Sequence, residues 1–94
     1  RDWQQAIDHA RRYEQATHEP MGRLVAQFEC ELAEKARLRG DGVQARQHLE
    51  RAHAADANSV RAALLEGQIE LADGNDAAAI RAYERAARQD IEFL

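Results

Sequence analysis

Apolar residues recur at spacings of three and four along most of the chain, which is the period of an amphipathic α-helix. Nowhere do apolar and polar residues alternate over a run long enough to predict a β-strand. The fold class is therefore all-α, with five helices. They are expected from Asp2 to about Gln15, from Pro20 to the turn at Gly40, from Gly42 to about Ala55, from a cap at Asn58 or Ser59 to the turn at Gly74, and from Asp76 to about Asp90.

Two turn signals separate these helices into antiparallel neighbours. They read Gly40-Asp41-Gly42 and Gly74-Asn75-Asp76, and each comes directly after a helical stretch. Glycine adopts the left-handed conformation that ends a helix, and Asp or Asn can cap the helix that follows. Each signal therefore predicts a tight turn within a helical hairpin.

The chain also repeats itself at a fixed interval, which is the spacing between the two turn glycines, Gly40 and Gly74. The string LERAHAAD begins at Leu49 and YERAARQD at Tyr83, and four of their eight letters are identical. Small residues recur in the same register, as Ala33 with Gly67 and as an alanine three positions after Leu49 and Tyr83. A helix-turn-helix unit of about 34 residues is typical of tetratricopeptide repeats (TPR), so the chain resembles that family over nearly its whole length. The resemblance implies a helical-hairpin solenoid.

This resemblance divides the chain into a half repeat (1–19) and two full repeats (20–57 and 58–94), forming one domain of about two and a half repeats. We expect the domain to be a piece of a larger protein. The first helix matches the second half of a repeat, with Ala6 corresponding to Ala45, at an offset slightly longer than the repeat interval. The sequence departs from the family in two ways: Ala57 and Ile91 replace the usual closing prolines, and Glu66 and Glu70 stand where the family buries Leu and Tyr. We expect these two carboxylates to be solvated or paired with Arg81 or Arg85, rather than to form a site.

Composition and charge exclude several classes of function. The net charge is −4, and the arginines alternate with glutamates instead of clustering, which argues against nucleic-acid binding. No apolar run is long enough to span a bilayer, so no membrane contact is expected from this segment. A single cysteine, Cys30, forms no internal disulfide and favours a reducing compartment. The apolar ends, with Trp3 at one and Ile91, Phe93 and Leu94 at the other, predict self-association as a homodimer.

The sequence shows no pattern that predicts catalysis. The four histidines, His9, His18, His48 and His53, form no i, i+4 pair and are expected on the surface. Cys30 has no activating base nearby in the sequence and is expected to be a half-buried small hydrophobe. No phosphate-binding loop or metal-ligand spacing is present. We therefore expect no enzymatic activity, no catalytic residue, no metal and no cofactor in this segment.

Surface recognition remains as the expected function. In stacked helical hairpins the first helix of each pair lines the concave side, which suits an extended peptide or a partner helix. The repeat register places ten residues in this groove: Gln27, Cys30, Glu34, Arg37, Leu38, Arg61, Leu64, Gln68, Leu71 and Ala72.

Three further strings point to a narrower family. Asp2-Trp3-Gln4-Gln5-Ala6-Ile7, Cys30-Glu31-Leu32-Ala33 and Ala54-Ala55-Asp56-Ala57-Asn58-Ser59 are similar, in the same order, to motifs of lipopolysaccharide assembly protein B, a bacterial TPR family. The resemblance implies a parent anchored to the inner membrane, with cytoplasmic repeats and a rubredoxin-like metal site elsewhere in the chain. It also implies an adaptor that couples the deacetylase of lipid A synthesis to a membrane protease and so regulates lipopolysaccharide biosynthesis.

Two alternatives remain open at this point. The segment could be a helical accessory region of an N-acetylglucosaminyl transferase-like protein, or a generic assembly scaffold. Helical repeats do not themselves supply transferase chemistry.

Overall fold

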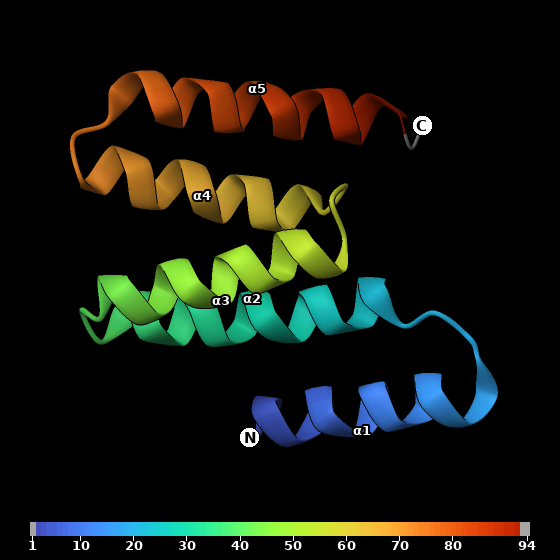
Figure 1. Cartoon of the computed structure of the whole chain (residues 1–94). Helices are drawn as coiled ribbons and strands as arrows, with labels where there is room; N and C mark the ends of the chain where they lie inside the picture. The colour runs from blue at the N-terminus through green and yellow to red at the C-terminus, as the bar shows by residue number, and fades with distance from the viewer. Residues whose placement is uncertain (1, 93–94) are drawn as a thin grey trace.

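The computed structural model describes the backbone of residues 2–92 and the side chains of residues 2–89. Five helices run in chain order (Figure 1): α1 (Trp3–Thr17), α2 (Gly22–Leu38), α3 (Gly42–Ala55), α4 (Val60–Ala72) and α5 (Asp76–Glu92). The described residues contain no strand. The prediction of five helices in an all-α fold is confirmed, although the second begins at Gly22 and not at Pro20.

Side-chain caps and turn glycines account for several of the helix boundaries, although the start of α2 has no side-chain cap. The side chains of Asp2, Asp41 and Ser59 each accept a hydrogen bond from the backbone N–H three residues later, at the starts of α1, α3 and α4. Gly40 and Gly74 both adopt a φ of 81°, a conformation that is costly for residues with a side chain. These caps and turns fold α2 back on α3 and α4 back on α5.

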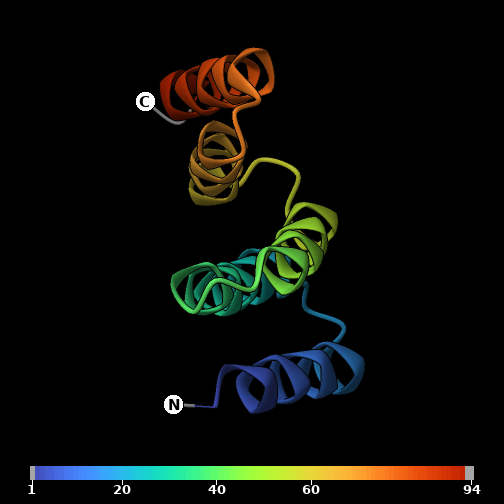
Figure 2. The same ribbon diagram turned by 90° about the vertical axis from the view of Figure 1, so that its left-hand side faces the viewer.

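The molecule is therefore a row of two helical hairpins preceded by a single helix (Figure 2). The principal-axis extents of 43 × 34 × 17 Å describe a thin, elongated array. Contacts are most extensive within the hairpins α2/α3 and α4/α5, whereas α4 touches α2 and α3 over shorter stretches. The joint between the two hairpins is thus packed less extensively than the interior of either hairpin.

Small apolar side chains build the main core, which lies in the first hairpin and its junction with α4. Its members are Ala26, Cys30, Ala33, Ala36, Ala45, Leu49, Ala52, Ala62, Leu65 and Ile69. Alanine lets helix backbones approach closely, and this explains how a chain with few large apolar residues still forms a packed interior. A second cluster of Ile7, Ala10 and Val25 attaches α1 to α2.

The repeat interval is visible in how the hairpins pack. Ala33 and Leu49 belong to the core of the first hairpin, and their counterparts in the second are Gly67 and Tyr83. A Cβ atom added at Gly67 would lie only 2.6 Å from Cε1 of Tyr83. The larger aromatic ring of Tyr83 therefore fits because the facing residue is glycine, which lacks the Cβ atom that Ala33 has at the equivalent position.

The longer offset of α1 also has a structural counterpart. Asp2 and Asp41 cap α1 and α3 in the same way, with Gln5 and Gln44 as the donors. Trp3 is half-buried, and its ring lies 5.5 Å from that of Phe28, centroid to centroid. The prediction of apolar open ends is not tested, since Phe93, Leu94 and the side chain of Ile91 lie outside the described residues. Among those residues, no helix is both long and apolar enough to cross a bilayer.

Candidate functional site

Two adjoining hollows lie along the face shared by α2 and α4. One hollow of about 420 Å³ lies between these helices and the α3–α4 turn, and a neighbouring hollow measures about 310 Å³. The two share Arg61 and Leu64, so they adjoin, and we call the pair the α2–α4 groove. The residues that line it are Arg23, Gln27, Glu34, Asp56, Asn58, Ser59, Val60, Arg61, Leu64, Leu65 and Gln68.

Arg61 stands at the centre of this groove and connects its two walls. Its Nη2 lies 2.5 Å from Oε1 of Glu31, and its Nη1 donates a 3.4 Å hydrogen bond to Oε1 of Gln27. Both partners are on α2, whereas Arg61 is on α4. The contacts hold the guanidinium between α4 and α2, and Glu31 offsets its charge.

Five of the ten predicted groove residues line this groove, namely Gln27, Glu34, Arg61, Leu64 and Gln68. Leu64 presents an apolar side chain that is 43% exposed. The carboxylates and amides beside it offer hydrogen-bonding groups of both kinds. This combination suits a peptide, whose backbone needs donors and acceptors and whose side chains need apolar contact.

Four other predicted residues lie near the C-terminal ends of α2 and α4, outside these hollows. Arg37 is paired with Glu34, with Nη2 and Oε1 2.6 Å apart, and this contact lowers the pKa of Glu34. Leu38 and Leu71 are 72% and 55% exposed, and Ala72 is also exposed. None of these four side chains lines either of the two hollows.

Placing Cys30 in the groove is wrong. Its side chain is fully buried in the core, because α4 packs over the position that it occupies on α2. Burial raises the pKa of its thiol, an effect partly opposed by Arg61 and by a hydrogen bond with Ser59. Cys30 was expected to be half-buried, but the packing of α4 buries it completely. A neutral, enclosed thiol is poorly suited to nucleophilic chemistry.

Sequence reasoning missed four polar residues of the groove, namely Arg23, Asp56, Asn58 and Ser59. Arg23 lies one turn before Gln27 on α2, and this spacing of four is a signal that could have identified it. Asn58 comes from the turn between α3 and α4, which the helix register does not describe.

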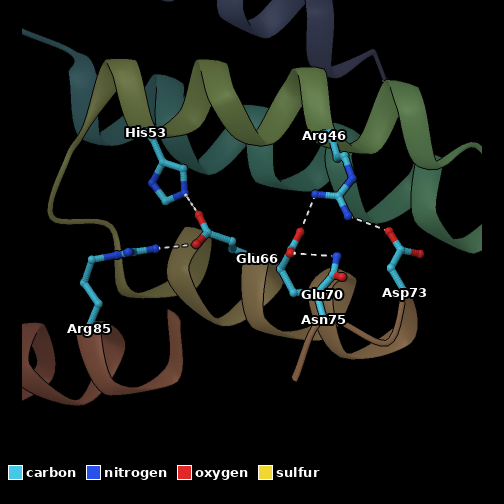
Figure 3. Close-up of polar contacts among 7 residues, drawn as sticks. All are labelled: Arg46, His53, Glu66, Glu70, Asp73, Asn75 and Arg85. Atoms are coloured by element: carbon cyan, nitrogen blue, oxygen red, sulfur yellow. Dashed lines mark hydrogen bonds and ion pairs between the residues drawn. The ribbon is translucent and has the colours of Figure 1, made fainter. Parts of the chain in front are cut away.

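The opposite face carries a chain of polar contacts across the joint between the hairpins (Figure 3). Glu66 accepts from Nε2 of His53 at 3.0 Å and from Nη2 of Arg85 at 2.6 Å, which connects α3, α4 and α5. Glu70 pairs with Arg46 and with Asn75. We call this set, with Asp73, the polar seam: Arg46, His53, Glu66, Glu70, Asp73, Asn75 and Arg85.

The polar seam confirms one predicted pairing and adds another. Arg85 pairs with Glu66 as expected, whereas Glu70 pairs with Arg46 of the preceding hairpin, which was not foreseen. The guanidinium of Arg46 lowers the pKa of Glu70, while Asp73 and Glu70 raise that of Arg46. All four carboxylate oxygens of Glu66 and Glu70 have a partner in the seam.

One of the four histidines is not on the surface. His48 is only 9% exposed, and its Nδ1 donates a 2.8 Å hydrogen bond to Oε1 of Glu29, which is 5% exposed. The pairing satisfies two polar groups inside the hairpin α2/α3. The expectation holds for the exposed His9 and His18, is wrong for His48, and applies only in part to the half-buried His53.

The described residues hold no group of three or more His, Cys, Asp or Glu side chains that could bind a metal ion.

Comparisons with known proteins agree with the resemblance noted in the sequence. Three similar curated proteins are each named lipopolysaccharide assembly protein B, from Escherichia coli strain K12, strain CFT073 of serotype O6:H1, and serotype O157:H7. Each is 33% identical over 93 residues, which cover 99% of this chain and 24% of the relative. The resemblance to this protein is thus confirmed, and the chain spans about a quarter of the length of these relatives. No family model and no solved structure matches the chain.

Proposed function

We propose that the chain is a TPR-type protein-binding module of a bacterial regulator of lipopolysaccharide assembly. The observation that carries this proposal is the α2–α4 groove, where five residues singled out by the repeat register line the two adjoining hollows. The similarity to lipopolysaccharide assembly protein B along 99% of the chain supplies the biological context.

The groove favours an extended peptide over a small molecule. Amide side chains of Gln27, Asn58 and Gln68 can each donate and accept, as an extended backbone requires. Leu64 offers an apolar contact between them, and Arg61 is neutralised by Glu31. Partner recognition here depends on backbone hydrogen bonds and one apolar side chain more than on net charge.

The module acts as an adaptor and has no catalytic activity of its own. In the parent it brings the deacetylase of lipid A synthesis to a membrane protease, and thereby limits lipopolysaccharide production. The module lies in the cytoplasm, in a parent anchored to the inner membrane. Any metal site belongs to another part of that parent.

The test uses the full-length parent with Gln27→Ala and Gln68→Ala combined. Both side chains line the groove, and alanine preserves helical structure. Loss of two amide contacts should weaken capture of the deacetylase or the protease by roughly tenfold or more, with a matching change in cellular lipopolysaccharide.

The matched control is Gln15→Ala with Gln47→Ala, since both residues are exposed and lie outside the groove hollows. This variant should capture both partners normally. Equal capture by the groove and control variants, or failure of the unmodified parent to capture either protein, would overturn the proposal.

A further inference from the structure

The two hairpins carry their turns at the same edge of the molecule. The α2–α3 turn and the α4–α5 turn both lie at the left of Figure 1 and face the viewer in Figure 2. Arg46, near the start of α3, connects them because its guanidinium pairs with Glu70 and Asp73 near the end of α4. We call residues 34–43 the first tip and residues 68–77, their counterparts one repeat later, the second tip. Together the two tips form one surface, the turn edge.

The turn edge exposes apolar side chains that the packing of the chain does not use. Leu38 and Val43 of the first tip are 72% and 70% exposed, and no other large apolar side chain among the described residues is as exposed. Leu71 of the second tip is 55% exposed. None of the three lines the α2–α4 groove, so the turn edge is a separate surface. Covering these side chains would remove apolar area from water, which is favourable.

The two tips differ in the sign of their charge. The first tip holds two carboxylates and three cations, namely Lys35, Arg37 and Arg39. The second tip holds no cation and three carboxylates, namely Glu70, Asp73 and Asp76. Arg39 and Asp73 occupy equivalent positions, so the charge is reversed at the same place in the two turns. A surface with one basic and one acidic half is complementary to a second copy of itself.

The charged side chains of the turn edge remain accessible to a partner. The side chain of Arg39 is 57% exposed, and its Nη2 lies 4.0 Å from Oδ2 of Asp41, which is long for an ion pair. Asp73 is 55% exposed although it pairs with Arg46, and Asp76 is exposed in the first turn of α5. Counting Arg46 with the second tip still leaves that tip acidic. The tips therefore keep opposite charges after their own ion pairs have formed.

We propose that the turn edge is a homodimer interface, in which a two-fold axis sets the first tip of one copy against the second tip of the other. Two-fold symmetry makes each favourable contact twice, so basic meets acidic in both halves of the interface. Leu38 and Val43 of one copy then approach Leu71 of the other. An anionic membrane would attract the first tip but repel the second, so the charge pattern favours a second copy over a lipid surface. The inference does not depend on the proposed partner groove.

The interface is narrow, so the dimer is weak. Sedimentation equilibrium of the unmodified chain, at concentrations up to roughly 500 µM, should show a reversible dimer with a Kd on the order of 100 µM. On dilution, the amide NMR shifts of residues 37–43 and 70–77 should move together. Shifts confined to α1 and to the C-terminal half of α5 would assign the dimer to the open ends of the array and overturn the proposal.

The sharper test reverses the charge of one tip at a time. Lys35→Glu with Arg39→Glu makes the first tip acidic, and Asp73→Arg with Asp76→Arg makes the second tip basic. Either variant alone places like charges together in both halves of the contact, so its Kd for dimerisation should rise by roughly tenfold or more. An equimolar mixture of the two restores opposite charges in both halves. It should therefore form a heterodimer about as tightly as the unmodified chain dimerises.

The matched control is Arg12→Glu with Arg88→Glu, which changes the net charge as the acidic variant does but at exposed positions outside both tips. This control should dimerise like the unmodified chain, and circular dichroism checks that every variant keeps its helices. Charge-reversed variants that dimerise normally, or a mixture that does not recover, would overturn the proposal. So would a chain that is monomeric at every concentration. If that monomer bound vesicles containing phosphatidylglycerol, the first tip would instead belong to a lipid surface.

Discussion

The two hairpins have the same backbone plan but stabilise it with different pairs of side chains. In the first, Glu29 on α2 and His48 on α3 form a buried hydrogen bond. Their counterparts in the second hairpin are Ala63 and Ala82, both 0% exposed. A polar pair in one hairpin is thus replaced by two methyl groups in the other.

A second pair of facing positions also differs in both of its residues between the two hairpins. Ala33 and Leu49 in the first hairpin become Gly67 and Tyr83 in the second, where the ring occupies the space that a Cβ at position 67 would need. In both cases the two partners lie on facing helices and differ together. The repeat therefore conserves complementarity between positions more than the identity of any residue.

The largest expected effect comes from breaking the buried polar pair. Glu29→Ala should lower the free energy of unfolding by about 3 kcal/mol, because the ring of His48 would remain buried without its partner. Glu29→Ala with His48→Ala reproduces the second hairpin. Urea denaturation should show the double variant to be less destabilised than the sum of the single variants. Additive losses would argue against a direct interaction.

Overpacking at Gly67 should have a somewhat smaller effect. Gly67→Ala should cost about 2 kcal/mol, since the new methyl group would meet the Tyr83 ring at 2.6 Å. Adding Tyr83→Leu reproduces Ala33 and Leu49 and should recover most of that loss in thermal denaturation. A Gly67→Ala protein as stable as the parent would contradict the close approach.

The polar seam should contribute less, because its side chains are partly exposed. Arg46→Ala removes the contacts with Glu70 and Asp73 and should cost about 1 kcal/mol or less, since exposed ion pairs are weak. The control is Arg12→Ala, an exposed position on α1. Equal stability of the two variants at low salt would show that the seam does not hold the joint.

The smallest effect concerns the titration of one carboxyl group. Arg46 lowers the pKa of Glu70 below its ordinary value of 4.5, so the folded state holds this carboxylate ionised to lower pH than the unfolded state does. The associated stabilisation is present above pH 4.5 and is lost as the pH falls through the lowered value. Carboxyl NMR titration should show this pKa rising in Arg46→Ala. An unchanged pKa would contradict the pairing.

Local sequence signals predicted the helices and turns because caps act within a few residues. The effects of Gly40 and Asp41 are local, since Gly40 adopts the left-handed φ at the end of α2 and Asp41 caps α3. The repeat interval identified which positions of the two helices in a hairpin face each other. The pairing of Arg85 with Glu66 was foreseen because those residues belong to one hairpin.

The misplaced residues depend on contacts that no local pattern contains. Cys30 and Leu64 occupy equivalent positions, yet α4 covers only the first, so equal register gave unequal burial. His48 is buried because Glu29, on the facing helix, points toward it. Arg46 reaches Glu70 only because the hairpins stack. Five of the ten predicted groove residues do line the two hollows, because the repeat register places them on the facing sides of α2 and α4.

The central claim is that the two hairpins share one register in which facing residues change together. The most direct test is the NMR measurement of nuclear Overhauser effects between the Tyr83 ring protons and the α protons of Gly67. The account predicts strong effects together with ring-current shifts at Gly67, and methyl contacts between Ala33 and Leu49 at the equivalent place. Tyr83 ring contacts with other residues of α4 and none with Gly67 would contradict it.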